Sequence, residues 1–537
     1  MLTAVAETSR PDCPSFRDVL AGNARSWPDR PYVISIDQEG RALSYGQLWK
    51  LSNRVAHHLA SAGIGAGDRV LLLAENSIEN MAVFVSVLRH GATLATVHVE
   101  MNGAHLAEIV RAIAPKLVLY QDGLGLEALR DQAPPGDWRP LGEWRAEAAG
   151  CTGFFADIAT LPEDDLPSVA GPDDAGVIFY TSGTVARPKG VIQTHATAWC
   201  NYDATADYLG LQPGDRVLDC RSYSWLSAQH MSLGAPLVAG ATCVMAKHFS
   251  RSRYAAWLKE HDVDIGFVVP TMVNILLEDA PPGLSAATLP RLRFLTCSSA
   301  PLLEEQWRRF EDRFGIVLAQ SCGSSEAGNT AAHRGADRKI GTIGPPQKYQ
   351  VIRILDADGN DLPQGRTGEI LVTGGKQQAF GYLMPDGTID RTPAEGHRTG
   401  DLGFIDSDGH LHITGRVKEL IIRGGVNIAP LEVDAVLAGH DAVAEAGTIG
   451  VPHPIYGEEV VSYVALKPGR SADAAELIAH CAGRLPPFKT PKAIYFLDVL
   501  PKNARAKLDR TALSARHAAP APESAPPLSR PGTGSRA

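Results

Sequence analysis

The chain has 537 residues, of which 44% are hydrophobic and 21% are charged, a composition typical of a globular protein with more than one core. Its formal net charge of -9 argues against a nucleic-acid partner, and no apolar run reaches the length of about 18 residues that a membrane span needs. Residues 1–16 lack the pattern of a secretory signal and the 8 cysteines form no C-x-x-C pair, so we expect a cytoplasmic protein with free thiols.

Helices and short apolar strands alternate along the first half of the chain. Residues 45–62 carry apolar side chains at helical spacing, and residues 78–88 form a second helical stretch. Apolar runs that read as strands occur at residues 69–74, 116–120, 215–219 and 292–296. This alternation predicts an α/β fold with parallel sheets and crossover helices.

The pattern changes near residue 349. Two strand-like segments, residues 351–355 and 368–373, flank the turn sequence DADGN and predict a β-rich subdomain. An apolar run at residues 420–422 and a helix over residues 430–437 indicate a smaller α+β segment after Arg416. Residues 517–537 are rich in Pro, Ser, Ala and Gly, so we expect a disordered tail.

The sequence YTSGTVARPKGV, residues 180–191, directly follows a candidate strand over residues 176–180. Hydroxyl side chains around a glycine, close backbone N–H groups and a lysine suit phosphate oxygens. The predicted phosphate-binding residues are Thr181, Ser182, Gly183, Thr184 and Lys189. The spacing differs from the G-x-x-x-x-G-K-[ST] loop, and on composition alone the segment is equally well a polar turn between a strand and a helix.

This loop resembles the signature of the adenylate-forming superfamily, which comprises acyl-CoA synthetases, peptide-synthetase adenylation domains and beetle luciferases. The chain departs from the signature at Val185 and Ala186, where the family usually has Thr-Gly, so we expect a stiffer loop that lacks one hydroxyl. Further segments resemble the family's other motifs, in the family's order, over roughly residues 15 to 515.

The segment QSCGSSE, residues 320–326, is similar to the family's Q-x-Y-G-x-T-E motif. The resemblance implies that Ser325 binds the α-phosphate and that Glu326 holds Mg²⁺, a cation that needs few carboxylates beside phosphate oxygens. Cys322 stands where an aromatic side chain usually stacks on adenine, so we expect weaker nucleotide binding and a wider acyl pocket. The other residues implied for the nucleotide site are Ser321, Gly323, Ser299, Ala300 and Pro301.

Two later motifs resemble the ribose-binding and hinge segments of the family. In the TGD motif, residues 399–401, the two acceptor oxygens of Asp401 suit the vicinal hydroxyls of ribose. In GRVKELIIRGGVN, residues 415–427, the resemblance implies that Arg416 also binds ribose and that Lys418 is the hinge. Gly424 and Gly425 would let a pantetheine arm pass close to the backbone.

The segment LPKNARAKLDR, residues 500–510, resembles the motif that carries the family's catalytic lysine, which corresponds to Lys507. Ala506 replaces the usual glycine beside it. His195, just beyond the phosphate loop, is a further catalytic candidate because the family often has histidine there. We hypothesise that Lys507 bridges the substrate carboxylate and the α-phosphate, while Mg²⁺ and the loop bind the departing pyrophosphate.

The acid pocket is expected around the segment RSYSWLSAQH, residues 221–230. Amino-acid-activating relatives carry an aspartate here for the substrate ammonium, whereas this chain has Ser224 or Trp225. A buried ammonium without a carboxylate is costly, so we do not expect an α-amino acid as substrate. The predicted pocket residues are Ser224, Trp225, Gln229 and Ser298, with His230 and Met231 nearby, and the alternative for Trp225 is a purely structural core position.

The resemblance implies a large α/β N-terminal adenylation domain, residues 1–417, with two αβαβα subdomains and a β-rich subdomain. A small mobile α+β lid domain would follow over residues 418–516. The implied activity is ATP-dependent, AMP-forming ligation of an acyl or aryl acid to coenzyme A. Two alternatives stay open: an enzyme that loads a separate carrier protein, and a non-catalytic nucleotide-binding homologue. The four departures favour the homologue, whereas retention of Glu326, Asp401, Arg416 and Lys507 argues against it.

Overall fold

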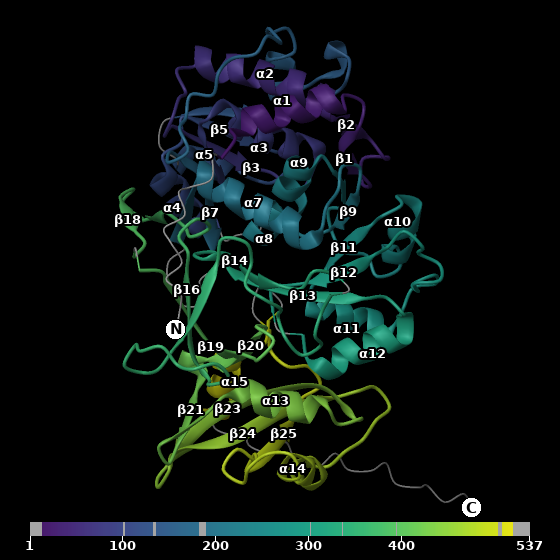
Figure 1. Ribbon diagram of the computed structural model, residues 1–537. Coiled ribbons are helices and arrows are strands. Elements are labelled where there is room, and N and C mark those ends of the chain that lie inside the picture. Colours follow the sequence, from purple (N-terminus) through teal and green to yellow (C-terminus); the bar gives the residue numbers. More distant parts are fainter. Residues whose placement is uncertain are drawn as a thin grey trace, which may run out of the picture. The chain divides into compact units, whose positions relative to one another are not determined.

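The chain folds into two compact units, Met1–Thr414 (unit 1) and Gly415–Ala537 (unit 2). This computed structural model describes residues 13–99, 103–132, 136–181, 189–300, 302–335, 337–393, 395–502 and 507–518. The boundary expected after residue 417 falls inside a short 3-10 helix, η3 (Val417–Glu419). Figure 1 shows the elements of both units coloured along the sequence.

One eight-stranded sheet of unit 1 has the order β14-β13-β12-β11-β9-β10-β1-β2. Its strands are β1 (Pro31–Ser35), β2 (Ala42–Ser44), β9 (Arg216–Asp219), β10 (Thr242–Met245), β11 (Ile265–Val268), β12 (Phe294–Cys297), β13 (Leu318–Ser324) and β14 (Gly328–Ala332). The strands from β13 to β1 pair in parallel, and only the edge pairs β13–β14 and β1–β2 are antiparallel. The inner strands are short apolar runs buried on both faces, as parallel sheets require.

The second eight-stranded sheet of unit 1 has the order β18-β17-β8-β7-β4-β3-β5-β6. Its strands are β3 (Arg69–Leu73), β4 (Thr93–Thr96), β5 (Leu117–Tyr120), β6 (Asp137–Pro140), β7 (Ala175–Thr181), β8 (Lys189–Thr194), β17 (Gly381–Leu383) and β18 (Ile389–Arg391). Strands β7, β4, β3, β5 and β6 are parallel, whereas β8, β17 and β18 extend the sheet by antiparallel pairing.

Helices form three layers around these two sheets. The helices of unit 1 are α1 (Phe16–Ser26), α2 (Tyr45–Ser61), α3 (Ile78–His90), α4 (Gly103–Ile113), α5 (Glu127–Gln132), η1 (Ala148–Gly150), α6 (Gly153–Asp157), α7 (His195–Leu209), α8 (Leu226–Ala228), the π-helix η2 (Gln229–Gly234), α9 (Ala235–Ala239), α10 (Tyr254–Glu260), α11 (Pro270–Glu278) and α12 (Glu304–Phe314). Residues of both sheets share one core with α1, α2, α3, α7 and α9. The outer faces are covered by α10, α11 and α12 on one sheet and by α4 and α5 on the other. This confirms the predicted αβαβα arrangement.

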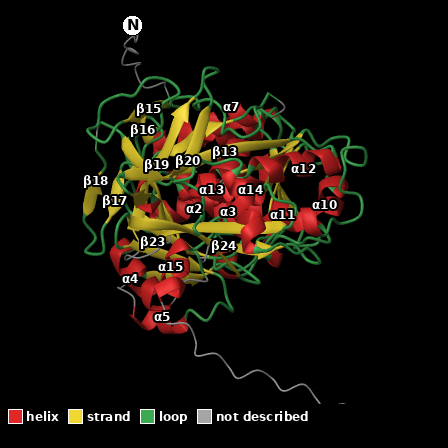
Figure 2. Ribbon diagram, turned by 90° about the horizontal axis from the view of Figure 1, so that it is seen from below, coloured by secondary structure: helices red, strands yellow, loops and turns green. Residues whose placement is uncertain are grey.

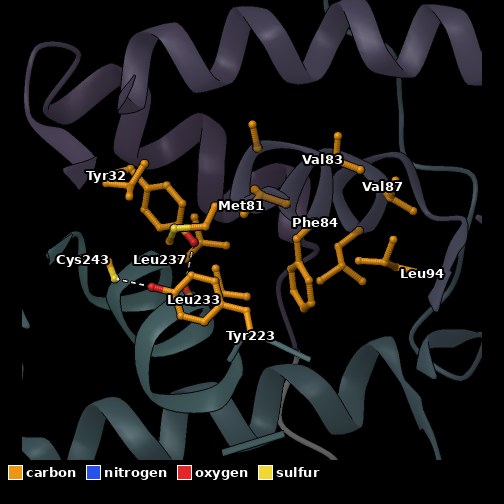
Figure 3. Packing of buried hydrophobic residues seen from close by; sticks show 14 of the residues in the cluster. Tyr32, Met81, Val83, Phe84, Val87, Leu94, Tyr223, Leu233, Leu237 and Cys243 are labelled. Carbon is orange, nitrogen blue, oxygen red and sulfur yellow. Dashed lines mark hydrogen bonds between the residues drawn. The ribbon is translucent and has the colours of Figure 1, made fainter. Parts of the chain in front are cut away.

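Alternating side chains of the inner strands explain the layering. On β3, Val70 and Leu72 point into the shared core, whereas Leu71 and Leu73 point to the outer layer. Helix α3 is buried along its whole length, and Figure 3 shows its Met81, Val83, Phe84 and Val87 in this shared core together with Leu94 of β4 and with Leu233 and Leu237. The Tyr223 hydroxyl and the Cys243 thiol lie 3.2 Å apart in the same core.

A four-stranded sheet completes unit 1, with the order β15-β16-β19-β20. Its strands are β15 (Val351–Leu355), β16 (Gly368–Thr373), β19 (His397–Ile405) and β20 (Leu411–Arg416). The pairs β15–β16 and β16–β19 are antiparallel, so the predicted β-rich subdomain is confirmed with the predicted bounds for its first two strands.

Unit 2 is a small α+β fold around a five-stranded sheet of order β22-β21-β24-β23, with β25 beside β24. Its elements are β21 (Ile421–Arg423), β22 (Val426–Ile428), α13 (Pro430–Ala438), β23 (Val443–His453), β24 (Gly457–Leu466), α14 (Ala474–Ala482), β25 (Ala493–Phe496) and α15 (Arg510–Ala518). Helices α13 and α14 share one core with the sheet, and α15 packs in a second (Figure 2). Helix α15 includes residues 517 and 518, so the predicted tail begins two residues too early; residues 519–537 lie outside the described part of the chain. Among the described helices, none combines the length and the hydropathy that a bilayer crossing requires.

Candidate active site

The predicted phosphate loop closes a β-hairpin. Strands β7 and β8 are antiparallel, and the pair Thr181–Lys189 is the last before the loop. The loop itself, with Ser182, Gly183, Thr184 and the departures Val185 and Ala186, lies outside the described residues. Lys189 is exposed, and its Nζ lies 5.1 Å from the ring centroid of Tyr382 on the neighbouring strand β17.

A second hairpin carries the predicted phosphate and metal residues Ser325 and Glu326. They occupy the turn between β13 and β14, where the Ser324 hydroxyl accepts from the Ala327 N–H at 2.9 Å. The backbone carbonyl of Glu326 accepts from the Ala379 N–H at 2.7 Å, which fixes the turn against the segment leading into β17. Burial and the Glu326 carboxylate together raise the pKa of the Tyr382 phenol. Lys189, Tyr382 and Glu326 therefore lie together, although three separate segments of the chain carry them.

A second carboxylate of this region is that of Asp401 on β19. The Asp401 backbone N–H donates to the Thr399 hydroxyl at 3.1 Å, and that hydroxyl donates to the Ile370 carbonyl of β16 at 3.0 Å. His397, at the start of β19, faces Glu326, Asp401 and Glu369; burial lowers the pKa of this histidine, and the three carboxylates oppose that shift. His397 therefore links the predicted metal residue with the predicted ribose residue, a position that no sequence motif indicated.

The predicted adenine-side residues lie at the ends of β12 and β13. Ser299 has φ +77° and is exposed, and the Ala300 carbonyl accepts from the Gln320 side-chain amide at 3.4 Å, which joins the two segments. Pro301 lies outside the described residues. Position 323 requires glycine because the backbone of β14 lies so close that a Cβ there would be 2.4 Å from the Gly328 carbonyl oxygen. Burial, with a contribution from the Asp401 carboxylate, raises the pKa of the Cys322 thiol to about 12.

Two of the predicted acid-pocket residues make structural hydrogen bonds. The Gln229 amide nitrogen donates to the Thr96 hydroxyl and the Tyr223 carbonyl, both at 2.8 Å, which holds η2 against the end of β4. The Ser224 hydroxyl donates to the Val97 carbonyl at 3.3 Å. Trp225 is half-buried and stacks on His98 with ring centroids 5.9 Å apart, so these two rings form one wall beside the carboxyl ends of β4 and β9.

The fourth acid-pocket residue, Ser298, contacts a buried ion pair that the sequence analysis did not identify. Arg221 and Asp219 are 5% and 0% exposed, and Arg221 Nη2 lies 2.7 Å from Asp219 Oδ2. Arg221 Nη1 donates to the hydroxyls of Ser298 and Ser227, at 3.2 and 3.3 Å. Charged residues within an otherwise apolar strand segment were the available signal for this pair, because such residues are buried only when they are paired.

The structure places His195 away from the phosphate loop. The residue begins α7, at the end of β8 opposite the phosphate loop, and the six residues of β8 separate the two by roughly 20 Å of extended chain. Its ring packs beside Phe16 with centroids 6.0 Å apart, and burial lowers its pKa to about 4. His195 is close to the phosphate loop in sequence but not in space, because β8 leads the chain away from the loop.

In unit 2, the predicted lid residues occupy turns and a short helix. Lys418 lies in η3, and Gly424 and Gly425 form a two-residue hairpin turn between β21 and β22 with φ values of +60° and +81°. Lys507 precedes Leu508, which bridges to Lys502; Ala506 lies outside the described residues. Arg510, which the motifs left without a role, donates to Asp434 at 2.6 Å and to Glu419 of η3 at 3.1 Å, and so ties the hinge segment to α13 and α15.

Comparison with known proteins decides the family. The family described as AMP-binding enzyme matches residues 20–383, which is more than half of the chain, and AMP-binding enzyme C-terminal domain matches residues 432–507. The chain belongs to the AMP-binding enzyme family. Within this family, it lies among the acid–CoA ligases of the adenylate-forming superfamily.

Relatives of this family member act on different acids. It is 34% identical over 511 residues to the sulfoacetate–CoA ligase of Cupriavidus necator, covering 92% of this chain and 96% of that protein. It is 29% identical over 514 residues to the fatty acid–[acyl-carrier-protein] ligase ScoC of Streptomyces coeruleorubidus, covering 92% and 95%. The crystal structure of ATP-bound MatB from Rhodopseudomonas palustris aligns with a TM-score of 0.82 at 26% identity, covering 93% and 99%.

Proposed function

We propose that this protein is an ATP- and Mg²⁺-dependent, AMP-forming carboxylic acid:CoA ligase. The observation that carries the proposal is the convergence of Lys189, Tyr382 and Glu326 in a chain that belongs to the AMP-binding enzyme family. An ammonium, a phenol and a carboxylate at one end of the sheet provide a cation for phosphate oxygens and an oxygen ligand for a metal. The likeness to ATP-bound MatB supports ATP as the nucleotide.

Glu326 suits Mg²⁺ that arrives with ATP. Mg²⁺ in nucleotide sites takes one or two carboxylates and completes its shell with phosphate oxygens and water. Glu326 supplies one half-buried carboxylate, and among the described residues no cluster of three or more His, Cys, Asp or Glu side chains forms a metal site from protein alone. When bound, Mg²⁺ would neutralise phosphate charge; the chain's own contribution is to hold Glu326 in the β13–β14 turn.

In the first half-reaction, a carboxylate oxygen of the acid attacks the α-phosphorus of ATP and pyrophosphate leaves. Lys189 and its loop would bind the pyrophosphate side, Ser325 the α-phosphate, and Asp401 with Arg416 the ribose. Lys507 would bridge the carboxylate and the α-phosphate, where one lysine–phosphate pair at ~4 Å contributes about 4 kcal/mol at an effective dielectric near 20. The chemistry is mainly positioning and charge neutralisation.

In the second half-reaction, the CoA thiol loses its proton and attacks the acyl carbon, and AMP leaves. We propose that unit 2 rotates about Lys418 between the two steps, so that Lys507 leaves and a thiol enters. The exposed Gly424–Gly425 turn has no side chain to obstruct a pantetheine arm. Its two positive φ values are readily adopted by glycine and disfavoured for other residues.

The substrate is proposed to be a carboxylic acid without an α-ammonium group. Asp219 is the carboxylate next to the acid segment, and it is already engaged by Arg221, by the Ser232 hydroxyl and by the Arg221 backbone N–H. An ammonium buried here would lack a counter-charge, which is costly.

Loading of an acyl-carrier protein is the second candidate, and the similarity to ScoC favours it. Both candidates share the adenylation step and differ in the thiol that accepts the acyl group. The distinction therefore rests on the second half-reaction.

The test is release of AMP and pyrophosphate from Mg·ATP across a panel of aliphatic, aromatic and amino acids. Each acid is assayed alone, with CoA and with a phosphopantetheinylated carrier protein. CoA-dependent AMP release with at least one acid is expected. Pyrophosphate exchange that only the carrier protein converts to turnover would establish the second candidate. No exchange with any acid, despite ATP binding, would indicate a non-catalytic homologue.

A further inference from the structure

The acid side of unit 1 contains a buried ion pair with two hydroxyl groups at its positive end. Arg221 Nε and Nη2 donate to the two carboxylate oxygens of Asp219, at 2.9 and 2.7 Å. Asp219 also accepts from the Arg221 backbone N–H at 2.9 Å and from the Ser232 hydroxyl. The remaining nitrogen, Nη1, is not used by Asp219 and donates to Ser227 Oγ and Ser298 Oγ.

The arginine sets the direction of both serine hydrogen bonds. A guanidinium has donors and no acceptor, so each serine oxygen must accept from it, and each hydroxyl hydrogen remains available to donate elsewhere. Within the described chain, neither hydroxyl donates to another residue. Because Asp219 cancels the charge at the far end, the pair acts as a dipole whose positive end lies at the serines, an arrangement that favours an electron-rich oxygen.

Both serines belong to segments expected to line the acid pocket, where Ser298 is buried at 4% exposure. Ser298 directly follows β12, at the carboxyl edge of a parallel sheet, where ligands of open α/β folds bind. It precedes the exposed Ser299 of the predicted adenine segment. Ser227 is half-buried in α8, two residues after Trp225, whose ring stacks on His98.

A separate observation shows that the interior beside Ser298 is polar. Thr296 lies two residues before Ser298 on the same face of the sheet, and its buried hydroxyl lies near the buried hydroxyl of Tyr208. The Ser321 hydroxyl also lies near that of Tyr208. Hydroxyl groups therefore cluster beside Ser298, an environment that suits an oxygen-bearing ligand better than an alkyl chain.

We propose that Ser227 and Ser298, held as hydrogen-bond donors by Arg221, select acids that carry an acceptor oxygen at the end away from the reacting carboxyl group. The inference rests on the proposed acid ligase function and names its substrate class. The acceptor is either neutral, as in a keto or hydroxy group, or anionic, as in a sulfonate or second carboxylate. Arg221 is a positioning residue that acts through the two serines.

The test compares kcat/KM for CoA-dependent AMP release within pairs of acids of the same shape. The neutral pair is 4-oxopentanoate and 4-methylpentanoate, and the anionic pair is sulfoacetate and 3,3-dimethylbutanoate. In at least one pair, we expect the oxygen acid to be preferred by about tenfold or more, because its absence leaves the site's donors unpaired. The pair with the larger preference identifies the acceptor as neutral or anionic.

Serine variants assign that preference to the site. Ser227→Ala and Ser298→Ala should each reduce it by about tenfold, mainly through KM for the oxygen acid. The KM for ATP and the turnover of the apolar partner should stay unchanged, and Ser227→Thr should keep the preference because it keeps the hydroxyl. Ser222→Ala is the matched control, since the one hydrogen bond of the Ser222 hydroxyl within the described residues is accepted from the Ser224 N–H, at 3.3 Å, and does not involve Arg221.

Three outcomes would overturn the inference while leaving the ligase function in place. One is equal use of the oxygen and apolar acids, and another is an equal loss for both in the serine variants. The third is turnover of other acids of the broad panel with neither oxygen acid accepted. No turnover of any acid would instead contradict the proposed ligase function itself.

Discussion

The proposed nucleotide side and the proposed acid side of unit 1 hold their polar groups in opposite ways. On the nucleotide side, Lys189 is exposed and Glu326 and Asp401 are only half-buried, so their charges stay hydrated before a ligand binds. On the acid side, Asp219 and Arg221 are buried and satisfy each other, with serine hydroxyls attached to them.

The two sides would therefore recognise their ligands in different ways. A polyanion with its own Mg²⁺ is recognised by charges that cost the fold little, since hydrated charges need no internal partner. A small acid offers fewer contacts, so its recognition depends on groups that the protein has already oriented. On the acid side, selectivity and stability therefore depend on the same residues, whereas on the nucleotide side they are separable.

The largest expected effect comes from Lys507, which is proposed to bridge the substrate carboxylate and the α-phosphate. Lys507→Ala should slow adenylation about a thousandfold, because a charge contact of about 4 kcal/mol is lost. Thiolysis of a supplied acyl-adenylate should continue. Lys502→Ala, which removes a lysine paired with Glu445 at 2.6 Å, serves as the control and should change neither step. If the adenylation rate of Lys507→Ala is within threefold of the wild-type rate, Lys507 does not have the proposed role in adenylation.

On the acid side, neutralising a charge should act first on stability. Asp219→Asn leaves Arg221 buried without its counter-ion, so the free energy of unfolding should fall by about 3 kcal/mol. Urea denaturation measures the change. Asp215→Asn removes the partner of a half-exposed arginine, Arg293, and should cost under about 1 kcal/mol. Equal losses for the two variants would contradict the contrast between the two sides.

On the nucleotide side, the same kind of change should act on catalysis and leave stability alone. Glu326→Gln should lower kcat/KM for Mg·ATP by about a hundredfold, because the amide binds Mg²⁺ and its phosphates far less well than a carboxylate. Its unfolding midpoint in urea should match that of wild type. Glu305→Gln on the exposed face of α12 is the matched control and should leave both quantities unchanged. A destabilised but active Glu326→Gln would reverse the assignment.

The last expected effect is a pH dependence of stability from the buried His230 of the proposed acid side. Burial lowers the pKa of His230 from 6.5 to about 3, so the folded state binds fewer protons than the unfolded state below pH 6.5. The contribution of neutral His230 to the free energy of unfolding is fully present above pH 6.5. It is lost by about 1.4 kcal/mol per pH unit as the pH falls toward the pKa of His230 in the folded state. Urea unfolding between pH 7 and about 4.5 should therefore show a shallower slope for His230→Gln than for wild type. Identical slopes would mean that His230 is already protonated when folded.

Local patterns predicted much of the fold. The helix expected over residues 45–62 is α2, Tyr45–Ser61, begun by a Ser44–Gln47 capping box, and the strands expected at 351–355 and 368–373 are β15 and β16. These elements carry their periodicity and end signals within a few residues. The αβαβα and β-rich subdomains were implied by family resemblance, because strand pairing joins residues far apart in the chain and local patterns do not encode it.

The family motifs identified Lys189, Glu326 and Asp401, which the structure brings into one region. On the proposed acid side, the segment around Trp225 was predicted, but the ion pair of Asp219 and Arg221 was not. The contact of Arg221 with Ser298 joins residues 77 positions apart, which no local pattern encodes. His195 shows the reverse case, since it is close to the phosphate loop in sequence but β8 leads the chain away from the loop.

The thiol of Cys322 bears on a hazard inherent in the proposed chemistry. An acyl-adenylate is a mixed anhydride that any thiolate within reach would intercept, which would leave the enzyme acylated on its own side chain. Burial raises the pKa of Cys322 to about 12, so at neutral pH only about one molecule in 10⁵ would carry the reactive thiolate. With its thiol protonated at neutral pH, Cys322 would spare the proposed acyl-adenylate for the incoming cosubstrate.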